Sequence, residues 1–387
     1  MIYLDYAASS PPFSDCAVLI SELMCSTYGN PAALHGAGTE ARKILQDSRL
    51  RMARLLGVRD REVFFTSGGT EANNWAVKLG CQHRPGGTLL VGAAEHSSVL
   101  ESARSMESHG FRVRLLPPDS GGHIRPEDVH RFIGPDTALL CVQAVNNETG
   151  AVQDVEAIAS IAKKHRVPFL CDAVQSFGHL AQPLHSADLI TLSAHKFGGP
   201  RGVGCLIARY PHTPKPFLHG GGQELGLRSG TENIPGIAAM VLAAERSAQL
   251  LSQEQERLGQ LSGLLWEGLR QIDPRLERNG SAPLHPGILN CRFPDISGEA
   301  LTLALARKGI CVSPGAACAA RDPSPSHVLL AMGCSADEAR NSLRFSLGRT
   351  TTQQDIMDTI HAVEQILASS GKRESTGGKK ATTPGAV

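Results

Sequence analysis

The stretch SAHKFGGP, residues 193–200, follows a short apolar run, DLITL at residues 188–192, that is rich in β-branched side chains. Such a run predicts a buried strand, and the two glycines and the proline predict the loop after it. Lys196 is therefore expected just past the carboxyl end of a strand, where α/β sheets bind ligands. Its amine could form a Schiff base with an aldehyde cofactor, although a surface lysine in a turn fits the same pattern.

Polar residues also follow the other predicted strands. The strand at residues 62–66 leads into SGGTE (67–71), and the later strands are followed by His96, Asn147 and Asp172. Strands alternate with helical patterns, which predicts a doubly wound α/β sheet whose strand ends meet at one edge. Each polar residue on its own also fits a helix cap or another structural role.

Together, these residues supply the parts that pyridoxal phosphate requires. A glycine-rich turn between a strand and a helix presents backbone N–H groups to a phosphate. His96 offers an imidazole for a ring face, and Asp172, with Gln175 three residues later, offers a carboxylate for a pyridinium nitrogen. Because each signal is weak alone, the prediction depends on their joint occurrence, in this order, with Lys196.

Composition excludes several classes of protein. The chain has 387 residues, of which 38 are basic and 37 acidic, so neither nucleic acid nor an anionic membrane is an expected partner. No apolar run reaches the ~18 residues of a spanning helix, and the N-terminus lacks signal-peptide features, so we expect a cytoplasmic protein. The ten cysteines form no CxxC pair, which predicts neither a metal site nor a disulfide framework.

The pattern of elements predicts two domains and a tail. Residues 14–260 form the large, cofactor-binding domain. Residues 1–13 and 261–368 form a smaller α+β domain, in which strands and helices are shorter. Residues 369–387 are rich in Ser, Gly, Lys and Thr and are predicted to be disordered.

Nine short motifs extend this interpretation over nearly the whole chain. They are YLDYAA (3–8), GNP (29–31), TSGGTE (66–71), EH (95–96), NNETG (146–150), DAVQS (172–176), SAHK (193–196), RSGT (228–231) and RFSLGR (344–349). With these motifs the sequence resembles the cysteine desulfurases of the class-V aminotransferase family, which are fold-type I pyridoxal-phosphate enzymes.

The resemblance implies roles around the cofactor ring. Lys196 would hold pyridoxal phosphate as a Schiff base, and Asp172 would pair with its ring nitrogen. His96 would stack on the ring and shuttle protons. Gln175 would bond the phenolic oxygen, with Asn147 nearby.

The resemblance also implies which residues bind the two anionic groups, the cofactor phosphate and the substrate carboxylate. The cofactor phosphate would be held by Gly69, Thr70, Ser193 and His195, together with Thr231 from a second subunit of a homodimer. The substrate carboxylate would be bound by Asn30 and Arg344, since a planar guanidinium suits that task.

Cys318 lies in SPGAACAARD (313–322), a stretch of small residues and proline that predicts a mobile loop. The resemblance makes it the nucleophile that takes sulfur from L-cysteine as a persulfide, releasing L-alanine. The loop length is similar to that of the long-loop group, in which this cysteine can swing outward to an acceptor and could be a transient iron–sulfur ligand. Pro314 and Ala316 depart from the family pattern, in which serine occupies the latter position.

The sulfur acceptor stays open, because the C-terminal extension of the housekeeping members is not matched. An iron–sulfur scaffold and a tRNA-thiolation enzyme are both compatible. The alternatives are a selenocysteine lyase with much the same site, a class-V aminotransferase or lyase without a persulfide step, and a non-catalytic sulfur-relay scaffold. An inert Cys318 is the corresponding structural alternative.

Overall fold

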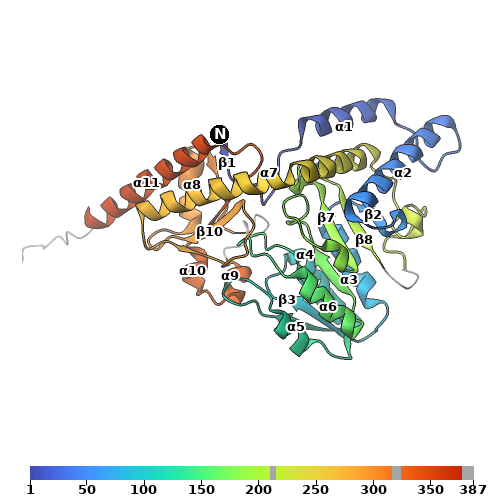
Figure 1. The fold of residues 1–387 in the computed structure, drawn as a ribbon, viewed down its shortest axis with the longest axis horizontal. Coiled ribbons are helices and arrows are strands. Elements are labelled where there is room, and N and C mark those ends of the chain that lie inside the picture. The colour runs from blue at the N-terminus through green and yellow to red at the C-terminus, as the bar shows by residue number, and fades with distance from the viewer. Residues whose placement is uncertain (210–214, 316–323, 377–387) are drawn as a thin grey trace, which may run out of the picture.

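A mixed sheet organises the first half of the chain. The computed structural model describes residues 1–209, 215–315 and 324–376, and within them it forms a seven-stranded sheet in the order β2-β8-β7-β6-β5-β3-β4 (Figure 1). The strands are β2 (Val63–Thr66), β3 (Thr88–Gly92), β4 (Arg112–Leu116), β5 (Thr137–Gln143), β6 (Phe169–Asp172), β7 (Leu189–Ser193) and β8 (Gly204–Ala208).

The direction of the strands brings the polar motifs to one edge. Strands β3 to β7 pair in parallel, whereas β8 is antiparallel to both β7 and β2, so β2 points the same way as β7. The carboxyl ends of β2, β3, β5, β6 and β7 therefore share an edge with the start of β8. The register aligns Asp172 with Gln143 on one side and Thr191 on the other. The predicted doubly wound mixed sheet is confirmed.

Alternating side chains pack against helices on both faces of the sheet. Leu140 and Val142 lie in one apolar core, while Leu139 and Cys141 lie in the other. The first core includes residues of α1 (Ser14–Ser26), α2 (Gly36–Leu56), α5 (Pro126–Phe132), α6 (Val155–His165) and α7 (Ile234–Ile272). The second includes residues of α3 (Gly69–Cys81) and α4 (Ser97–Ser105). Since both faces are covered, the strands read as continuous apolar runs in the sequence.

The long helix α7 joins this sheet to a second region (Figure 1). Its first half contacts α1 and α2, and α11 (Gln353–Thr376) also packs against it. A third apolar core contains Leu4 and residues between 258 and 366. We call the part of the molecule built on this core the C-terminal core region. Its helices are α8 (Gly298–Arg307), α11 and the second half of α7, whereas α9 (His327–Ala331) and α10 (Ala336–Arg340) form a separate small cluster with Ala94.

Two small sheets support the C-terminal core region in the described part of the chain. One is antiparallel, with β10 (Ile288–Arg292) between β12 (Ser342–Ser346) and β9 (Glu277–Arg278). The other pairs β1 (Ile2–Tyr3) with β11 (Ile310–Cys311) in parallel, so the N-terminus joins this region. The division into domains at 14–260, and at 1–13 with 261–368, stays a prediction.

The last helix differs from its predicted end. Helix α11 continues to Thr376, whereas the sequence pattern placed its end at residue 368 and disorder from 369. Lys, Arg and Glu residues are good helix formers, so a polar composition by itself does not end a helix. Residues 377–387 lie outside the described residues. No helix in the described ranges is long and apolar enough to cross a membrane.

Candidate active site

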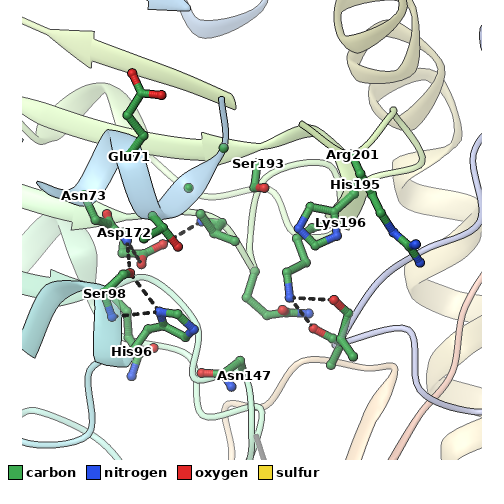
Figure 2. Close-up of a pocket in the computed structure, with 18 of the residues that line it drawn as sticks. Glu71, Asn73, His96, Ser98, Asn147, Asp172, Ser193, His195, Lys196 and Arg201 are labelled. Carbon is green, nitrogen blue, oxygen red and sulfur yellow. Dashed lines mark hydrogen bonds between the residues drawn. The ribbon is translucent and has the colours of Figure 1, made fainter. Parts of the chain in front are cut away.

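A cavity of about 380 Å³ lies at the carboxyl edge of the large sheet (Figure 2). Its lining comes from the loops after β2, β3, β5, β6 and β7, from the N-terminal segment and from β12. The predicted site residues that line it are Gly69, Thr70, His96, Asn147, Asp172, Gln175, Ser193, His195, Lys196 and Arg344. Residues scattered over 276 positions of the sequence, from 69 to 344 inclusive, thus meet in one pocket.

A polar network fixes the acid and the imidazole of the site (Figure 2). The Asn73 amide nitrogen donates to Asp172 Oδ2 at 2.8 Å and to Ser98 Oγ at 2.9 Å, while Asn73 Oδ1 accepts from Thr191 Oγ1 at 2.6 Å. Ser98 then contacts His96 Nδ1, which accepts from the Ser98 backbone N–H at 3.1 Å and lies 2.8 Å from its hydroxyl. We call Asn73, His96, Ser98 and Asp172 the sheet wall.

The network also assigns the proton on His96. Because Nδ1 accepts a backbone hydrogen bond and so caps α4, a neutral His96 carries its proton on Nε2. The histidine is therefore a helix cap and a pocket residue at once. Asp172 is likewise held from both sides, since its Oδ1 accepts from the Val174 N–H at 2.9 Å.

Lys196 lies in a short 3-10 turn directly after β7. Its Nζ donates to the backbone oxygens of Ala7 at 2.5 Å and Ala8 at 3.1 Å, so the N-terminal segment forms part of the pocket (Figure 2). The Lys196 carbonyl accepts from Ser10 Oγ at 2.7 Å and contacts His179 Nε2 at 3.0 Å. These contacts hold the lysine backbone while its side chain spans the cavity.

The start of α3 forms an anion site with the turn after β7. Gly69 lies so close to the ends of β6 and β7 that a Cβ there would lie 2.9 Å from Val174 Cγ2, just after β6, and 3.4 Å from Ser193 Cβ, the last residue of β7. Ser193 is buried, and His195 Nδ1 contacts Ser9 Oγ at 3.2 Å. Burial, reinforced by the nearby cations Lys196 and Arg201, lowers the pKa of His195 to about 4.

Arg344, on β12, closes the other end of the cavity. One of its terminal nitrogens donates to Asp5 Oδ1 at 2.7 Å and the other to the Asn147 carbonyl at 2.8 Å. The side chain is 1% exposed, and its Nε has no hydrogen-bond partner within the described ranges. We call Asp5, Asn147 and Arg344 the arginine wall.

Three predicted site residues are not placed in the cavity. Asn30 is exposed, and its Oδ1 accepts from the Ala32 N–H at 2.9 Å instead. Its prediction as a carboxylate ligand rested on the motif alone, and in this chain the side chain is used to close a local turn. Thr231 is also exposed and outside the lining. Cys318 lies outside the described residues.

The loop that carries Thr231 is nevertheless bonded to the start of α3, where the cofactor phosphate is expected. Arg228 forms a two-point ion pair with Glu71, at 2.7 Å and 3.0 Å, and Glu71 Oε2 also accepts from the Ser67 N–H at 2.9 Å. The loop is thus anchored on α3 of its own chain. A role for Thr231 in the pocket of a second subunit stays a prediction.

Sequence reasoning missed the residues that orient the site. Asn73, Ser98 and Arg201 lie in none of the motifs, and Asp5 lies in YLDYAA (3–8) without an expected role, although each lines the pocket or bonds to a residue that does. A signal existed for Asn73: it shares a buried helical face with Ala76 and Val77, and an amide on such a face must find polar partners.

The residues present fit pyridoxal phosphate. Gln175 Oε1 is buried beside the cavity and has no hydrogen-bond partner among the described residues, as expected of a group that awaits a ligand. An anion site, a carboxylate fixed by two donors and a lysine amine lie around the same space. In the described part of the chain, no group of three or more His, Cys, Asp or Glu side chains is arranged to hold a metal ion.

Comparison with known proteins agrees with this site. Residues 2–358 match the family model of class-V aminotransferases. The chain is 35% identical over 374 residues to the cysteine desulfurase IscS of Dictyoglomus turgidum, covering 95% of this chain and 94% of the relative. The solved structure of a NifS-like protein has a TM-score of 0.88 and 33% identity, covering 95% and 99% of the two chains.

A second solved structure, of SspA in complex with cysteine, is 34% identical with a TM-score of 0.79, and the match covers 90% of this chain and 99% of that one. The matches span almost the full length of each relative, and the fold and the pocket agree with them. The chain therefore belongs to the class-V aminotransferase family, as a pyridoxal-phosphate-dependent cysteine desulfurase.

Proposed function

We propose that this enzyme converts L-cysteine to L-alanine and carries the sulfur as a persulfide on Cys318. The observation that carries the proposal is the convergence of Lys196, Asp172 and Arg344 on one cavity. A lysine and a carboxylate serve the cofactor, while a buried arginine serves a substrate carboxylate. The similar SspA structure holds cysteine, which supports the same substrate here.

Pyridoxal phosphate, when bound, supplies an electron sink for the carbon that bears the substrate amine. Lys196 would be its covalent attachment point, and Asp172 would pair with its ring nitrogen and favour the protonated form. The phosphate is held by Gly69, Thr70 and Ser193, with His195 as a neutral donor. Gln175 bonds the phenolic oxygen.

His96 supplies a directed proton. Its Nδ1 is held by Ser98, so Nε2 is the nitrogen that can give up or receive a proton in the pocket. Arg344 orients the substrate by its carboxylate, because Asp5 and the Asn147 carbonyl fix the guanidinium before substrate arrives.

In the sulfur step, the Cys318 thiolate attacks the substrate sulfur. An S–S bond forms as the C–S bond of the substrate breaks, and the electron pair stays with the substrate carbon. That carbon takes up a proton and leaves as L-alanine, while the enzyme retains a persulfide. Cysteine and enzyme thiol thus give alanine and enzyme persulfide with no external oxidant or reductant.

The wider assembly is part of the same proposal. We expect a cytoplasmic homodimer, in which Thr231 reaches the phosphate of the second subunit. The persulfide sulfur passes to a protein acceptor, such as an iron–sulfur scaffold or a tRNA-thiolation enzyme.

Replacing Cys318 with Ser tests the proposal. A serine hydroxyl is almost wholly protonated near neutral pH, and cysteine is intrinsically the better nucleophile. The Cys318→Ser protein is therefore expected to bind pyridoxal phosphate and to show a cysteine-dependent absorbance change, but to carry no persulfide by mass spectrometry. Wild-type cysteine turnover by this variant would refute the persulfide step. Turnover of selenocysteine alone would favour a selenocysteine lyase.

A further inference from the structure

Glu148 is a buried acid that the proposed mechanism does not use. It lies in NNETG (146–150), one residue after Asn147, and its exposed fraction is 2%. Its carboxylate Oε2 accepts from Ser326 Oγ at 2.6 Å. Ser326 also caps α9, since its Oγ accepts from the Leu329 N–H at 3.3 Å.

The same carboxylate lies near the chain on the other side of Cys318. A Cβ built on Gly315, which has no side chain of its own, would lie 3.6 Å from Glu148 Oε2. Gly315 is in turn held by Ser313, whose Oγ donates to the Gly315 carbonyl at 2.6 Å. Ser313 pairs through its backbone with Arg344, the substrate-binding arginine. Glu148 thus lies between the last described residue before Cys318 and the start of the helix that follows it.

Helix α9 has a second attachment to the pocket. The His327 Nε2 atom contacts the Glu95 carbonyl at 2.9 Å, and Glu95 directly precedes His96. Val328, Leu329 and Met332 form a small apolar cluster with Ala94. The start of α9 is therefore fastened to the loops that carry His96 and Asn147.

The contacts of Glu148 can be separated by mutation. Its backbone N–H donates to Asn146 Oδ1 at 2.9 Å, and its carbonyl accepts from Asn290 Nδ2 at 3.1 Å. Both contacts use the backbone and survive a change of side chain. A substitution at position 148 therefore removes the link to Ser326 while the loop that holds Asn147 keeps its other bonds.

We propose that the Glu148 carboxylate is a positioning residue for the sulfur step, because it accepts a hydrogen bond from Ser326 and lies beside Gly315, and these two residues lie on either side of Cys318 in the sequence. The inference rests on the proposed role of Cys318. It predicts that loss of the acceptor oxygen at position 148 slows persulfide formation but leaves cofactor and substrate binding unchanged.

The main test compares Glu148→Ala with Glu148→Gln in the cofactor-loaded enzyme. The amide oxygen of glutamine can still accept from Ser326, so Glu148→Gln is expected to stay within about twofold of wild type. Glu148→Ala is expected to lower kcat roughly tenfold, the scale of one hydrogen bond to a charged group, with an unchanged KM for cysteine. Persulfide on Cys318, followed by rapid quench and mass spectrometry, is expected to form more slowly by the same factor.

A second pair of variants tests the same hydrogen bond from the Ser326 side, so that the test holds even if Glu148→Ala misfolds. Ser326→Ala removes the donor and is expected to slow persulfide formation similarly, whereas Ser326→Thr keeps the hydroxyl and the rate. Ser335→Ala is the matched control, because Ser335 caps the equally short α10 without contacting the pocket. It is expected to leave kcat unchanged.

Two results would overturn the inference: wild-type persulfide formation in both Glu148→Ala and Ser326→Ala, or an equal loss in Glu148→Gln and Glu148→Ala. If instead the proposed function is wrong, the Cys318→Ser variant keeps its cysteine turnover. If only the inference fails, Cys318→Ser is inactive while Glu148→Ala is active.

Discussion

The two walls of the pocket are built in different ways. The sheet wall comes from one alternating β/α pattern: Asp172 ends β6, His96 and Ser98 follow β3, and Asn73 on α3 links them. The arginine wall is assembled from remote segments, since Arg344 is 339 positions from Asp5 and 197 from Asn147. Sheet topology alone places the first wall, whereas the second exists only when the C-terminal core region docks.

The difference in construction matches a difference in task. In the proposed function, the sheet wall presents a fixed carboxylate and an imidazole with a defined tautomer to the cofactor. The arginine wall presents a preformed cation to the substrate carboxylate, which does not react. Changes in the sheet wall are therefore expected to alter the cofactor itself, and changes in the arginine wall to alter the use of cysteine.

The largest effect is expected in the arginine wall. Arg344→Lys keeps the charge, but its single nitrogen cannot reproduce the planar fork whose two terminal nitrogens bond Asp5 and the Asn147 carbonyl separately. A loss of about 2–3 kcal/mol in binding would raise the KM for cysteine roughly 30- to 150-fold, with the cofactor absorbance unchanged.

Arg340→Lys is its control, because Arg340 forms an exposed pair with Asp337 in the same region. Its KM is expected to equal that of wild type. An altered cofactor spectrum in Arg344→Lys would show that the two walls are not separable.

A smaller effect is expected from Asn73→Ala, and it concerns cofactor affinity rather than the KM for cysteine. This change leaves Asp172 Oδ2 and Thr191 Oγ1 without their buried partner, which costs about 1–3 kcal/mol in the free energy of unfolding. Cofactor affinity is expected to fall, measured by titration of the apo-protein, while the KM for cysteine in the loaded enzyme changes little.

Asn74→Ala is the matched control, since Asn74 bonds the Thr70 carbonyl on the exposed side of the same helix. Its stability is expected to stay within about 0.5 kcal/mol of wild type. An equal loss in both variants would contradict a special role for the buried amide.

The smallest effect concerns His195 and pH. The pKa of this histidine falls from 6.5 to about 4 in the folded chain, through burial and then through Lys196 and Arg201. Between these values the unfolded chain binds the proton and the folded chain does not, so the contribution of His195 to stability is lost as the pH falls through this window. Between about pH 7 and pH 5, apo His195→Asn is expected to lose roughly 2–4 °C less in Tm than apo wild type.

His361→Asn, on the exposed face of α11, is the control and is expected to respond to pH as wild type does. If the Tm of His195→Asn and that of wild type fall equally with pH, His195 does not limit stability in acid.

The sheet wall and its neighbours could largely be predicted from sequence. Asp172, His96 and Lys196 each follow a buried strand, and the rule that parallel strand ends share an edge places them together. Asn30 shows the limit of that reasoning: a motif names a residue type, but the local turn decides where its side chain points. Asn73 and Ser98 could not be assigned, because their importance lies in partners on other strands.

What the sequence by itself determined is the order of strands and helices, the chemistry of the strand-end residues and, through its motifs, the family. These features follow from local periodicity and from short segments, which carry their information within a few residues. Only the tertiary structure decided that Asp5 and Asn147 fix Arg344, that Asn73 joins Asp172 to His96, and that Glu148 meets Ser326. Those contacts join residues 25 to 339 positions apart, and such pairs are set by the docking of whole elements rather than by local pattern.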